Sequence, residues 1–392
     1  MRTLKVLLLA AVAVAAIGFM PIFRPSAISA TSTEKPSDYD RELAKIESDL
    51  AAPPKPGSNP VDRALRQAGL LYRRASLSGD FGQFQAAEKA IDEAFAVVGP
   101  TEDLVLLRAQ FNFKLHRLKS TEADVRALSE QGESSGLQAL AADLALQEGR
   151  YEEARRGYLK ALEIHPASWD NLARLAYLQS KTGDYAGAER SYAKAQEEIS
   201  AKEMRSYAWV ELQKGILDLE RKRYKSALAH YRKADRAYSG YWLIEEHIAE
   251  VLDLTGQTKD AIALYEKIIG TTHNPEYLNA LGRIRERSDP DAAQKLYAEA
   301  DRRNEERFAL YPEAAIGHLI RDTLVRRTPR PDLLELAQRN YDLRPNGESK
   351  LLLARAYLKA ERRAEAKKLL DEIASTPWTT PELALVRRQV SG

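Results

Sequence analysis

The sequence predicts an all-α solenoid built from repeated helix–turn–helix units, and two observations lead to this prediction. Alanine, tyrosine and alanine recur at spacings of four and three residues, first in residues 154–161 and again 34 residues later in residues 188–195. Residues with these spacings share one face of a helix, so each set marks a packed helical face. No segment alternates apolar and polar residues in the manner of a strand.

The same period places turn residues between the helices. Gly149, Gly183 and Gly256 each follow a predicted first helix, and glycine readily takes the left-handed conformation that ends helices. Pro166 follows a predicted second helix, because proline cannot continue the helical hydrogen-bond ladder. A single pair of such helices cannot bury its apolar face, so each unit is expected to stack on its neighbours.

This pattern resembles the tetratricopeptide repeat (TPR) family, whose repeats are 34 residues long. The resemblance implies a right-handed superhelix in which the first helix of each unit lines an inner groove. We expect about nine repeats over residues 61–392. The clearest predicted units are residues 135–168, 169–202, 208–241 and 242–275. The turn of the first unit, near residues 79–82, is expected to be about six residues longer than usual.

The N-terminus predicts export from the cytoplasm. Arg2 and Lys5 precede an apolar run over residues 6–20, and small residues follow near Ala30, as in a secretory signal over residues 1–30. The alternative is an uncleaved anchor over residues 6–23, which would then be the only membrane contact. Both hypotheses place the remainder outside the cytoplasm, in a bacterial periplasm. Residues 31–60 read as a proline-rich spacer, interrupted by a short helix near residues 39–50.

Composition argues against several kinds of function. The net charge of this 392-residue chain is +2, so a nucleic acid partner is not expected. Cysteine is absent, which excludes disulfides, thiolate metal sites and cysteine nucleophiles. The six histidines show no metal-binding spacing, so neither a metal nor a cofactor is expected.

One catalytic pattern occurs, at Ser134 within a G-x-S-x-G sequence. A nucleophile elbow needs a strand before the serine and a helix after it. Here a predicted helix precedes the serine, so we interpret residues 132–136 as a loop between repeats. No catalytic residues are predicted.

The inner groove supplies the candidate binding residues. Some TPR proteins bind a peptide C-terminus with lysine and asparagine at set inner positions, but those positions hold Leu140, Arg174, Gln213 and His247 here. A carboxylate clamp is therefore not expected. The candidates that remain for contact with a partner are Glu246, Glu250, Asp253, Tyr177 and Trp209.

The carboxylates and Trp209 each allow two interpretations. The three carboxylates share a helical face that the resemblance turns inward, where they would attract a basic segment of a partner or form only a solvated acidic face. Trp209 belongs with Leu212 and Ile216 either to an apolar patch of the groove or to the packed interface between helices.

The sequence thus predicts a non-catalytic extracytoplasmic scaffold or adaptor that binds a protein or peptide in its concave groove. The alternative is an accessory factor in the export or synthesis of an envelope polysaccharide or other polymer. An enzyme whose site is not visible as a motif is the third hypothesis.

Overall fold

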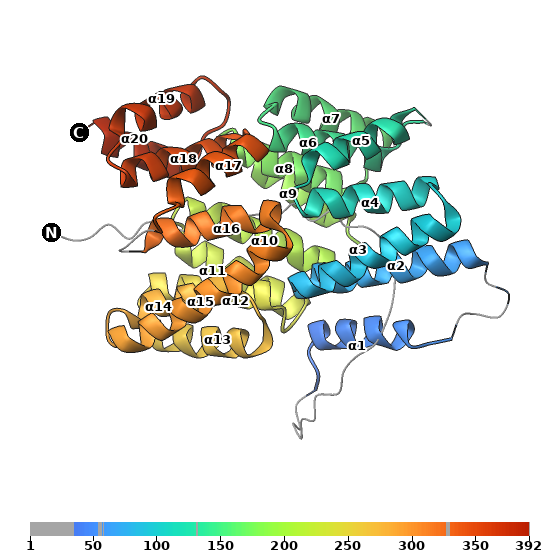
Figure 1. The fold of residues 1–392 in the computed structure, drawn as a ribbon, viewed down its shortest axis with the longest axis horizontal. Helices are drawn as coiled ribbons and strands as arrows, with labels where there is room; N and C mark the ends of the chain where they lie inside the picture. Colours follow the sequence, from blue (N-terminus) through green and yellow to red (C-terminus); the bar gives the residue numbers. More distant parts are fainter. Residues whose placement is uncertain (1–34, 54–56, 58, 131, 327–329, 392) are drawn as a thin grey trace.

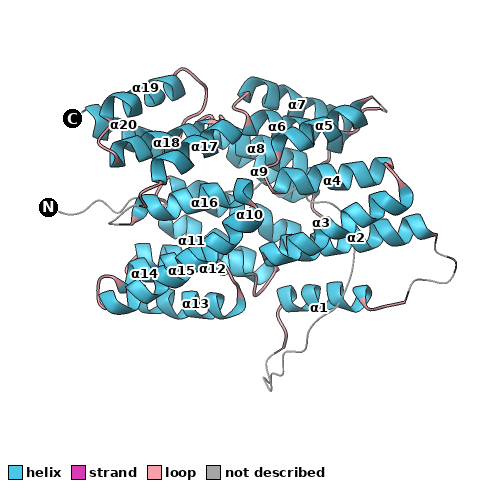
Figure 2. Ribbon diagram, viewed as in Figure 1, coloured by secondary structure: helices cyan, strands magenta, loops and turns pink. Residues whose placement is uncertain are grey.

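The computed structural model describes residues 35–53, 57, 59–130, 132–326 and 330–391. All regular secondary structure in these residues is α-helical (Figure 2). The predicted fold class, an all-α superhelical solenoid of helix–turn–helix repeats, is confirmed. Residues 1–34, which hold the predicted signal or anchor, lie outside the described part. None of the described helices combines the length and the apolarity that crossing a membrane requires.

Within the described residues, helices α2 to α19 form nine consecutive pairs, and the two members of each pair pack closely (Figure 1). The pairs are α2 (Pro60–Ser78) with α3 (Phe81–Val98), α4 (Glu102–Lys114) with α5 (Leu118–Ser129), α6 (Ser135–Gln147) with α7 (Tyr151–Ile164), α8 (Trp169–Lys181) with α9 (Tyr185–Glu198), α10 (Met204–Glu220) with α11 (Tyr224–Ala237), α12 (Trp242–Leu254) with α13 (Thr258–Thr271), α14 (Pro275–Arg285) with α15 (Pro290–Leu310), α16 (Pro312–Val325) with α17 (Leu333–Leu343), and α18 (Gly347–Lys359) with α19 (Arg363–Ala374). Helix α1 (Asp38–Leu50) precedes the pairs, and α20 (Pro381–Ser391) packs on α19.

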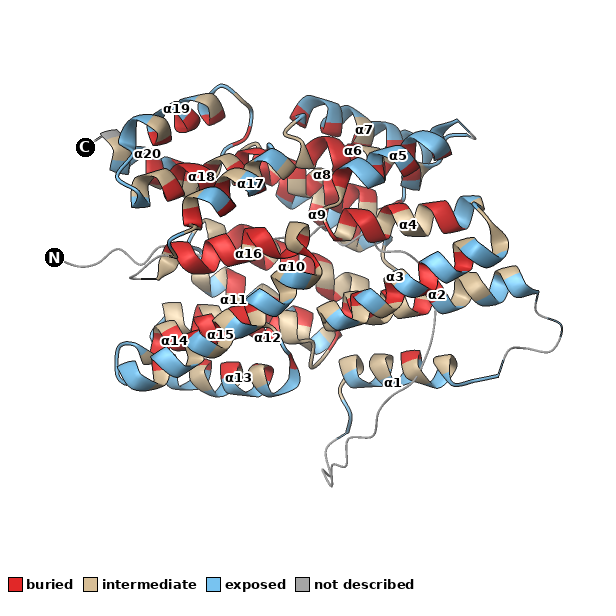
Figure 3. Ribbon diagram, in the orientation of Figure 1, coloured by how far each residue is buried: buried red, intermediate tan, exposed pale blue. Residues whose placement is uncertain are grey.

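The repeated residues form the buried layer between helices (Figure 3). Tyr158, Tyr192 and Tyr231 are among the largest fully buried side chains, and the alanines that flank each of them are also fully buried. Small residues let neighbouring helices approach closely, and the tyrosine ring fills the adjoining groove. Gly149 ends the first helix of its unit at φ 76°, a conformation that favours glycine.

The packing makes a direct prediction for Ala188, which is completely buried in α9 among Leu172, Ala176 and Val210. Replacing Ala188 with leucine is expected to overpack this contact and lower the free energy of unfolding by about 1–3 kcal/mol. Urea unfolding of the Ala188→Leu variant measures the effect. A midpoint equal to that of the unchanged protein would mean that the contact between helices lies elsewhere.

The turn of the first pair differs from the expectation. Gly79 ends α2 in the left-handed conformation at φ 68°, and the Asp80 side chain caps α3 by accepting a hydrogen bond from Gln83 N at 3.1 Å. The turn is therefore tight, and the extra residues extend α2 and α3 to 19 and 18 residues. Longer helices bury more of their apolar faces than a longer loop would.

Helix α1 lies in the segment read as a spacer, and it is held by residues far away in the sequence. The Asp38 carboxylate accepts hydrogen bonds from Ser239 N at 3.0 Å and Ser239 Oγ at 2.7 Å. The Glu42 carboxylate pairs with Arg205 at 2.9 Å and accepts a hydrogen bond from Tyr238 Oη at 2.6 Å. Helix α1 therefore fastens the start of the described chain to the junction of α11 and α12.

Further contacts join successive turns of the superhelix. Trp242 Nε1 donates to Leu77 O at 3.1 Å, and Tyr311 Oη donates to Glu88 at 2.7 Å. In the C-terminal part, Gly347 N donates to Tyr151 Oη at 2.6 Å. Accordingly, α17 and α18 lie beside α6 in Figure 1. These hydrogen bonds therefore hold turns of the superhelix against each other.

Candidate functional site

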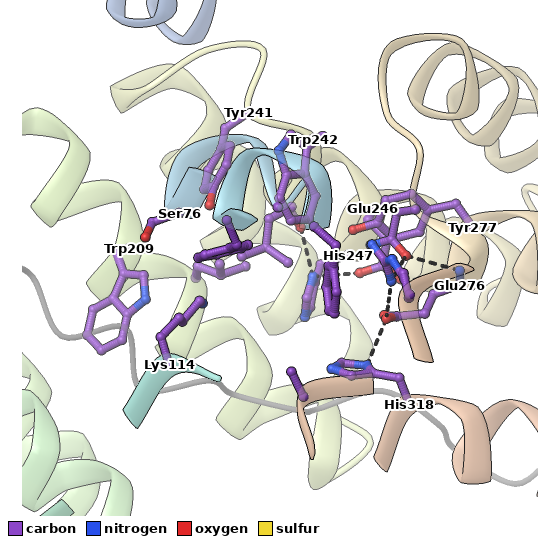
Figure 4. Close-up of a pocket in the computed structure, with 18 of the residues that line it drawn as sticks. Ser76, Lys114, Trp209, Tyr241, Trp242, Glu246, His247, Glu276, Tyr277 and His318 are labelled. Atoms are coloured by element: carbon purple, nitrogen blue, oxygen red, sulfur yellow. Dashed lines mark hydrogen bonds and ion pairs between the residues drawn. The ribbon is translucent and has the colours of Figure 1, made fainter. Parts of the chain in front are cut away.

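A cavity of about 210 Å³ lies where two turns of the superhelix meet (Figure 4). Its lining comes from the segment from α2 to the end of α4 and from the segment from α10 to α16. The described residues of the lining include six aromatic side chains: Phe81, Phe84, Trp209, Tyr241, Trp242 and Tyr277. The cavity therefore has predominantly aromatic and aliphatic walls, into which a few polar groups project.

The aromatic wall is fixed in place by its surroundings. The Tyr39 ring from α1 stacks on Tyr241 at a centroid distance of 5.7 Å, and Trp242 packs against Tyr277 at 5.9 Å. The hydrogen bond from Trp242 Nε1 to Leu77 O sets the orientation of the indole. Rigid walls of this kind lose little conformational entropy when a ligand binds.

A buried ion pair on α12 forms one part of the lining. Glu246 Oε2 lies 2.8 Å from His247 Nδ1, and the two residues are 2% and 5% exposed. Burial alone would lower the pKa of His247, but the neighbouring Glu246 carboxylate outweighs it and raises the pKa to about 9. Glu246 Oε1 and His247 Nε2 have no hydrogen-bond partner among the described residues. The pair thus retains an unused acceptor and an unused donor.

This pair predicts how stability depends on pH. The pKa of His247 is higher in the folded chain than its usual 6.5, so its contribution is complete below pH 6.5 and is lost as pH rises toward 9. We expect the His247→Gln variant to lose about 1–3 kcal/mol less stability than the unchanged protein between pH 6 and pH 9. Urea unfolding at both pH values tests this, with His273→Gln at an exposed position as the control. An equal loss of stability between pH 6 and pH 9 in all three proteins would contradict the raised pKa of His247.

The second carboxylate of the lining is Glu276, at the start of α14. Its Oε1 atom lies 2.7 Å from His318 Nδ1 and 3.5 Å from Arg307 Nη1. Burial raises the pKa of Glu276, but His318 and Arg307 outweigh burial and lower the pKa to about 2. Glu276 therefore stays ionised, and the nearby Arg307 compensates its negative charge within the wall.

Lys114, the last residue of α4, differs from these carboxylates. Its side chain extends toward the cavity in Figure 4, and burial lowers its pKa. Among the described residues it has no hydrogen-bond or ion-pair partner. Sequence reasoning missed Lys114, because α4 belongs to a degenerate repeat without the alanine–tyrosine–alanine pattern.

The structure separates the sequence candidates. Glu246 and Trp209 line the cavity, whereas Glu250 is half-buried with Oε2 unpartnered among the described residues. Asp253 pairs with Arg287 at 2.6 Å, outside the cavity. Tyr177 also lies outside the cavity lining, beneath Lys181 Nζ at 5.3 Å from its ring centroid. The three candidate carboxylates of α12, Glu246, Glu250 and Asp253, therefore do not form one continuous solvated stripe.

The positions compared with the carboxylate clamp also diverge. Gln213 and His247 line the cavity, whereas Leu140 is buried in the hydrophobic core and Arg174 is held by Asp143 at 2.9 Å. The two interpretations of the α10 apolar residues both apply in part. Leu212 and Ile216 pack in the core and also border the cavity beside Trp209.

The serine of the catalytic-like pattern has a structural role. Ser134 caps α6, and its Oγ atom accepts a hydrogen bond from Leu137 N at 3.2 Å. The element before it is helix α5, so the strand that a nucleophile elbow requires is replaced by a helix. Among the residues that the structure describes, no group of three or more histidine, aspartate or glutamate side chains is arranged to hold a metal ion.

Comparisons with known proteins agree with this architecture. Residues 137–242 match the family model of the TT21 fifth ARM repeats domain. Among solved structures, a monomeric mutant of IFIT1 with m7Gppp-AAAA is 15% identical, and the alignment covers 83% of this chain and 74% of that chain with a TM-score of 0.50. No curated protein matches the sequence.

Two bacterial proteins are also similar. A tetratricopeptide repeat protein from Parabacteroides merdae is 14% identical, with 83% of this chain and 99% of that chain covered and a TM-score of 0.35. PilF of Pseudomonas aeruginosa is 20% identical, with 61% and 90% covered and a TM-score of 0.36. The chain is a TPR-like repeat protein. TPR-like repeats generally serve as scaffolds for interactions between proteins and do not catalyse reactions.

Proposed function

We propose that this TPR-like protein is a non-catalytic extracytoplasmic scaffold that binds a partner protein by taking a short segment of it into the central cavity. The observation that carries the proposal is a set of buried polar atoms in residues that line this cavity, none of which has a hydrogen-bond partner among the described residues: Glu246 Oε1, His247 Nε2 and His116 Nδ1. A buried polar group without a partner costs about 1–3 kcal/mol. A segment that supplies complementary groups recovers this cost on binding.

The cavity suits a short segment better than a nucleic acid strand. The IFIT1 structure contains m7Gppp-AAAA, which carries several phosphates. Here Arg307 and His318 both lie within 3.5 Å of Glu276, and His247 lies 2.8 Å from Glu246, so Lys114 is the one lysine or arginine among the described lining residues that has no carboxylate partner. A chain of phosphates needs several free cations.

The location outside the cytoplasm is supported by the basic start, the apolar run and the small residues within residues 1–30. Intact-mass measurement of the protein from envelope fractions tests it. A mature chain that begins near Thr31 is expected, and a species that retains Met1 indicates the uncleaved anchor. Recovery from the cytosol alone would contradict export in either form.

Binding in the cavity can be tested with a single thiol, because the chain has no cysteine of its own. Ser76 lines the cavity, and Ser375 lies exposed after α19. We expect dialysed envelope extract to slow the alkylation of Ser76→Cys and to leave that of Ser375→Cys unchanged. Proteolysis of the extract should abolish this protection.

Two outcomes would contradict the proposal. Unchanged alkylation of Ser76→Cys in the extract would mean that nothing enters the cavity. Protection by the dialysable fraction alone would assign the cavity to a small molecule in place of a protein segment.

A further inference from the structure

We infer that the segment held in the cavity carries an aromatic side chain next to an anionic side chain, in contrast to the basic segment that the acidic residues of α12 suggested. The inference rests on the proposed function and specifies the chemistry of the partner. It follows from the balance of paired and unpaired charges around the cavity and from the nature of its walls.

The charges that face the cavity favour an anion. They come from α4, α12, α14, α15 and α16: Lys114, Glu246, His247, Glu276, Arg307 and His318. Each of the two carboxylates already has a basic partner in the wall: His247 lies 2.8 Å from Glu246, and Arg307 lies 3.5 Å from Glu276. The Lys114 ammonium has no such partner among the described residues. An incoming carboxylate would pair with Lys114, whereas an incoming cation would meet neutralised carboxylates and an unpaired ammonium.

A second donor lies beside Lys114, at His116 in the turn after α4. Arg344 Nη1 lies 3.0 Å from His116 Nε2, and because arginine can only donate, Nε2 must be the acceptor. Burial and the nearby Arg344 lower the pKa of His116, so its ring is neutral and its proton resides on Nδ1. Nδ1 is buried and unpartnered among the described residues. Lys114 and His116 thus offer two unused donors at the same end of α4.

The remaining lining selects an aromatic group. A dry cavity of about 150 Å³ is large enough to bind benzene. The cavity here, at about 210 Å³, therefore has room for one ring and a small charged group. Rings from several helices surround this space, and aromatic pairs gain energy in offset or edge-to-face contact. Trp209 and Lys114 line the same cavity, so a segment that binds there can place a ring and an anion on neighbouring residues.

The test compares three dipeptides with blocked ends, so that no terminal charge contributes. Acetyl-Asp-Phe-amide and acetyl-Asn-Phe-amide are nearly isosteric and differ in the charge beside the same ring. Acetyl-Lys-Phe-amide places the opposite charge there on a longer side chain. Binding to the full chain is measured by saturation-transfer NMR and by the fluorescence of Trp209 and Trp242, which line the cavity. We expect the aspartyl dipeptide to bind about tenfold more tightly than the asparaginyl one and the lysyl dipeptide to bind most weakly.

Variants assign the preference to Lys114. Lys114→Met should reduce binding of the aspartyl dipeptide to the level of the asparaginyl one, and Lys114→Arg should retain the preference. Lys119→Met, at an exposed position of α5, is the matched control. Circular dichroism and urea unfolding verify that each variant is folded.

The outcomes separate this inference from the proposed function. Equal binding of the three dipeptides, preference for the lysyl dipeptide, or no binding of any of them would overturn the inference. A preference that survives Lys114→Met would overturn it as well. If envelope protein still protects Ser76→Cys in these cases, the proposed function stands and only the chemistry assigned to the segment is wrong.

Discussion

Replacing Arg174 with methionine is expected to lower the free energy of unfolding by about 3–5 kcal/mol. The Asp143 carboxylate is 1% exposed and has two partners, Arg174 Nε at 2.9 Å and Tyr158 Oη at 2.7 Å. Without the guanidinium, Asp143 remains buried with the tyrosine hydroxyl alone. Removing one member of a buried ion pair leaves an uncompensated charge, which is far more costly than losing a surface pair. Urea unfolding at neutral pH measures the change.

Two further variants show whether the buried charge is the cause. Arg156→Met removes an exposed arginine of α7 and is expected to have almost no effect. The double variant Arg174→Met/Asp143→Leu removes both charges and should recover a large part of the loss, since apolar replacements of buried pairs are often tolerated. A loss below about 1 kcal/mol for Arg174→Met would mean that Asp143 is solvated or readily neutralised.

Gly215→Ala is expected to destabilise the protein by about 1–3 kcal/mol, although alanine is the better helix former. Gly215 lies within α10, directly against the fully buried ring of Tyr231 from α11, and an added Cβ would overlap that ring. The ring is enclosed in the core and can move only if its neighbours also move. Urea unfolding again measures the effect.

Gly270, within α13, provides the matched control. A Cβ at Gly270 would meet no other atom within 4 Å. Gly270→Ala is therefore expected to leave stability unchanged or to raise it by up to about 1 kcal/mol through the lower entropy of the unfolded chain. Equal effects at the two glycines would show that the close approach of α10 and α11 is misplaced.

The sequence was sufficient to predict the repeat architecture, because the packing between helices within a unit depends on residues close in sequence. Ala154 and Tyr158 share a core cluster with Ala142 and Leu146 of the same unit and with Leu178 of the next unit, so their contacts follow the 34-residue period. The same spacing recurs at Ala227, Tyr231 and Ala234, so it also marks Tyr231 as a core residue. It did not reveal that Gly215 makes room for its ring, since one glycine in a helix carries no periodic signal.

Closure of the superhelix could not be predicted in this way. The contacts between Asp38 and Ser239 and between His116 and Arg344 join residues 201 and 228 positions apart, in repeats that are not sequence neighbours. No local pattern encodes such contacts. For the same reason, the sequence predicted α1 only as a short helix within a spacer. In the structure, Glu42 of α1 contacts Arg205 of α10 and Tyr238 at the end of α11.

The candidate site, too, could be predicted from the sequence only in part. Glu246 was predicted to face inward because it lies on the first helix of its unit, whereas Trp209 was assigned either to the groove or to the packed interface. Both residues line the cavity. Their burial depends on α2 to α4 coming round from another turn, which the sequence alone does not indicate. Lys114 lines the cavity only because α4 packs near another turn of the superhelix. An isolated lysine at a helix end normally lies in solvent.

If the partner occupies the cavity between the two turns, a large side chain that fills the cavity should prevent the partner from binding. Ala314, in α16, lines the cavity and is 7% exposed, whereas Ala364, in α19, is exposed. Affinity capture from envelope extract is compared for the unchanged protein, Ala314→Phe and Ala364→Phe, after unfolding curves establish that each is folded. We expect Ala314→Phe to capture at least about tenfold less of the partner, while Ala364→Phe captures as much as the unchanged protein. Equal capture by both variants would contradict binding in the cavity, because the partner would then bind a surface outside it.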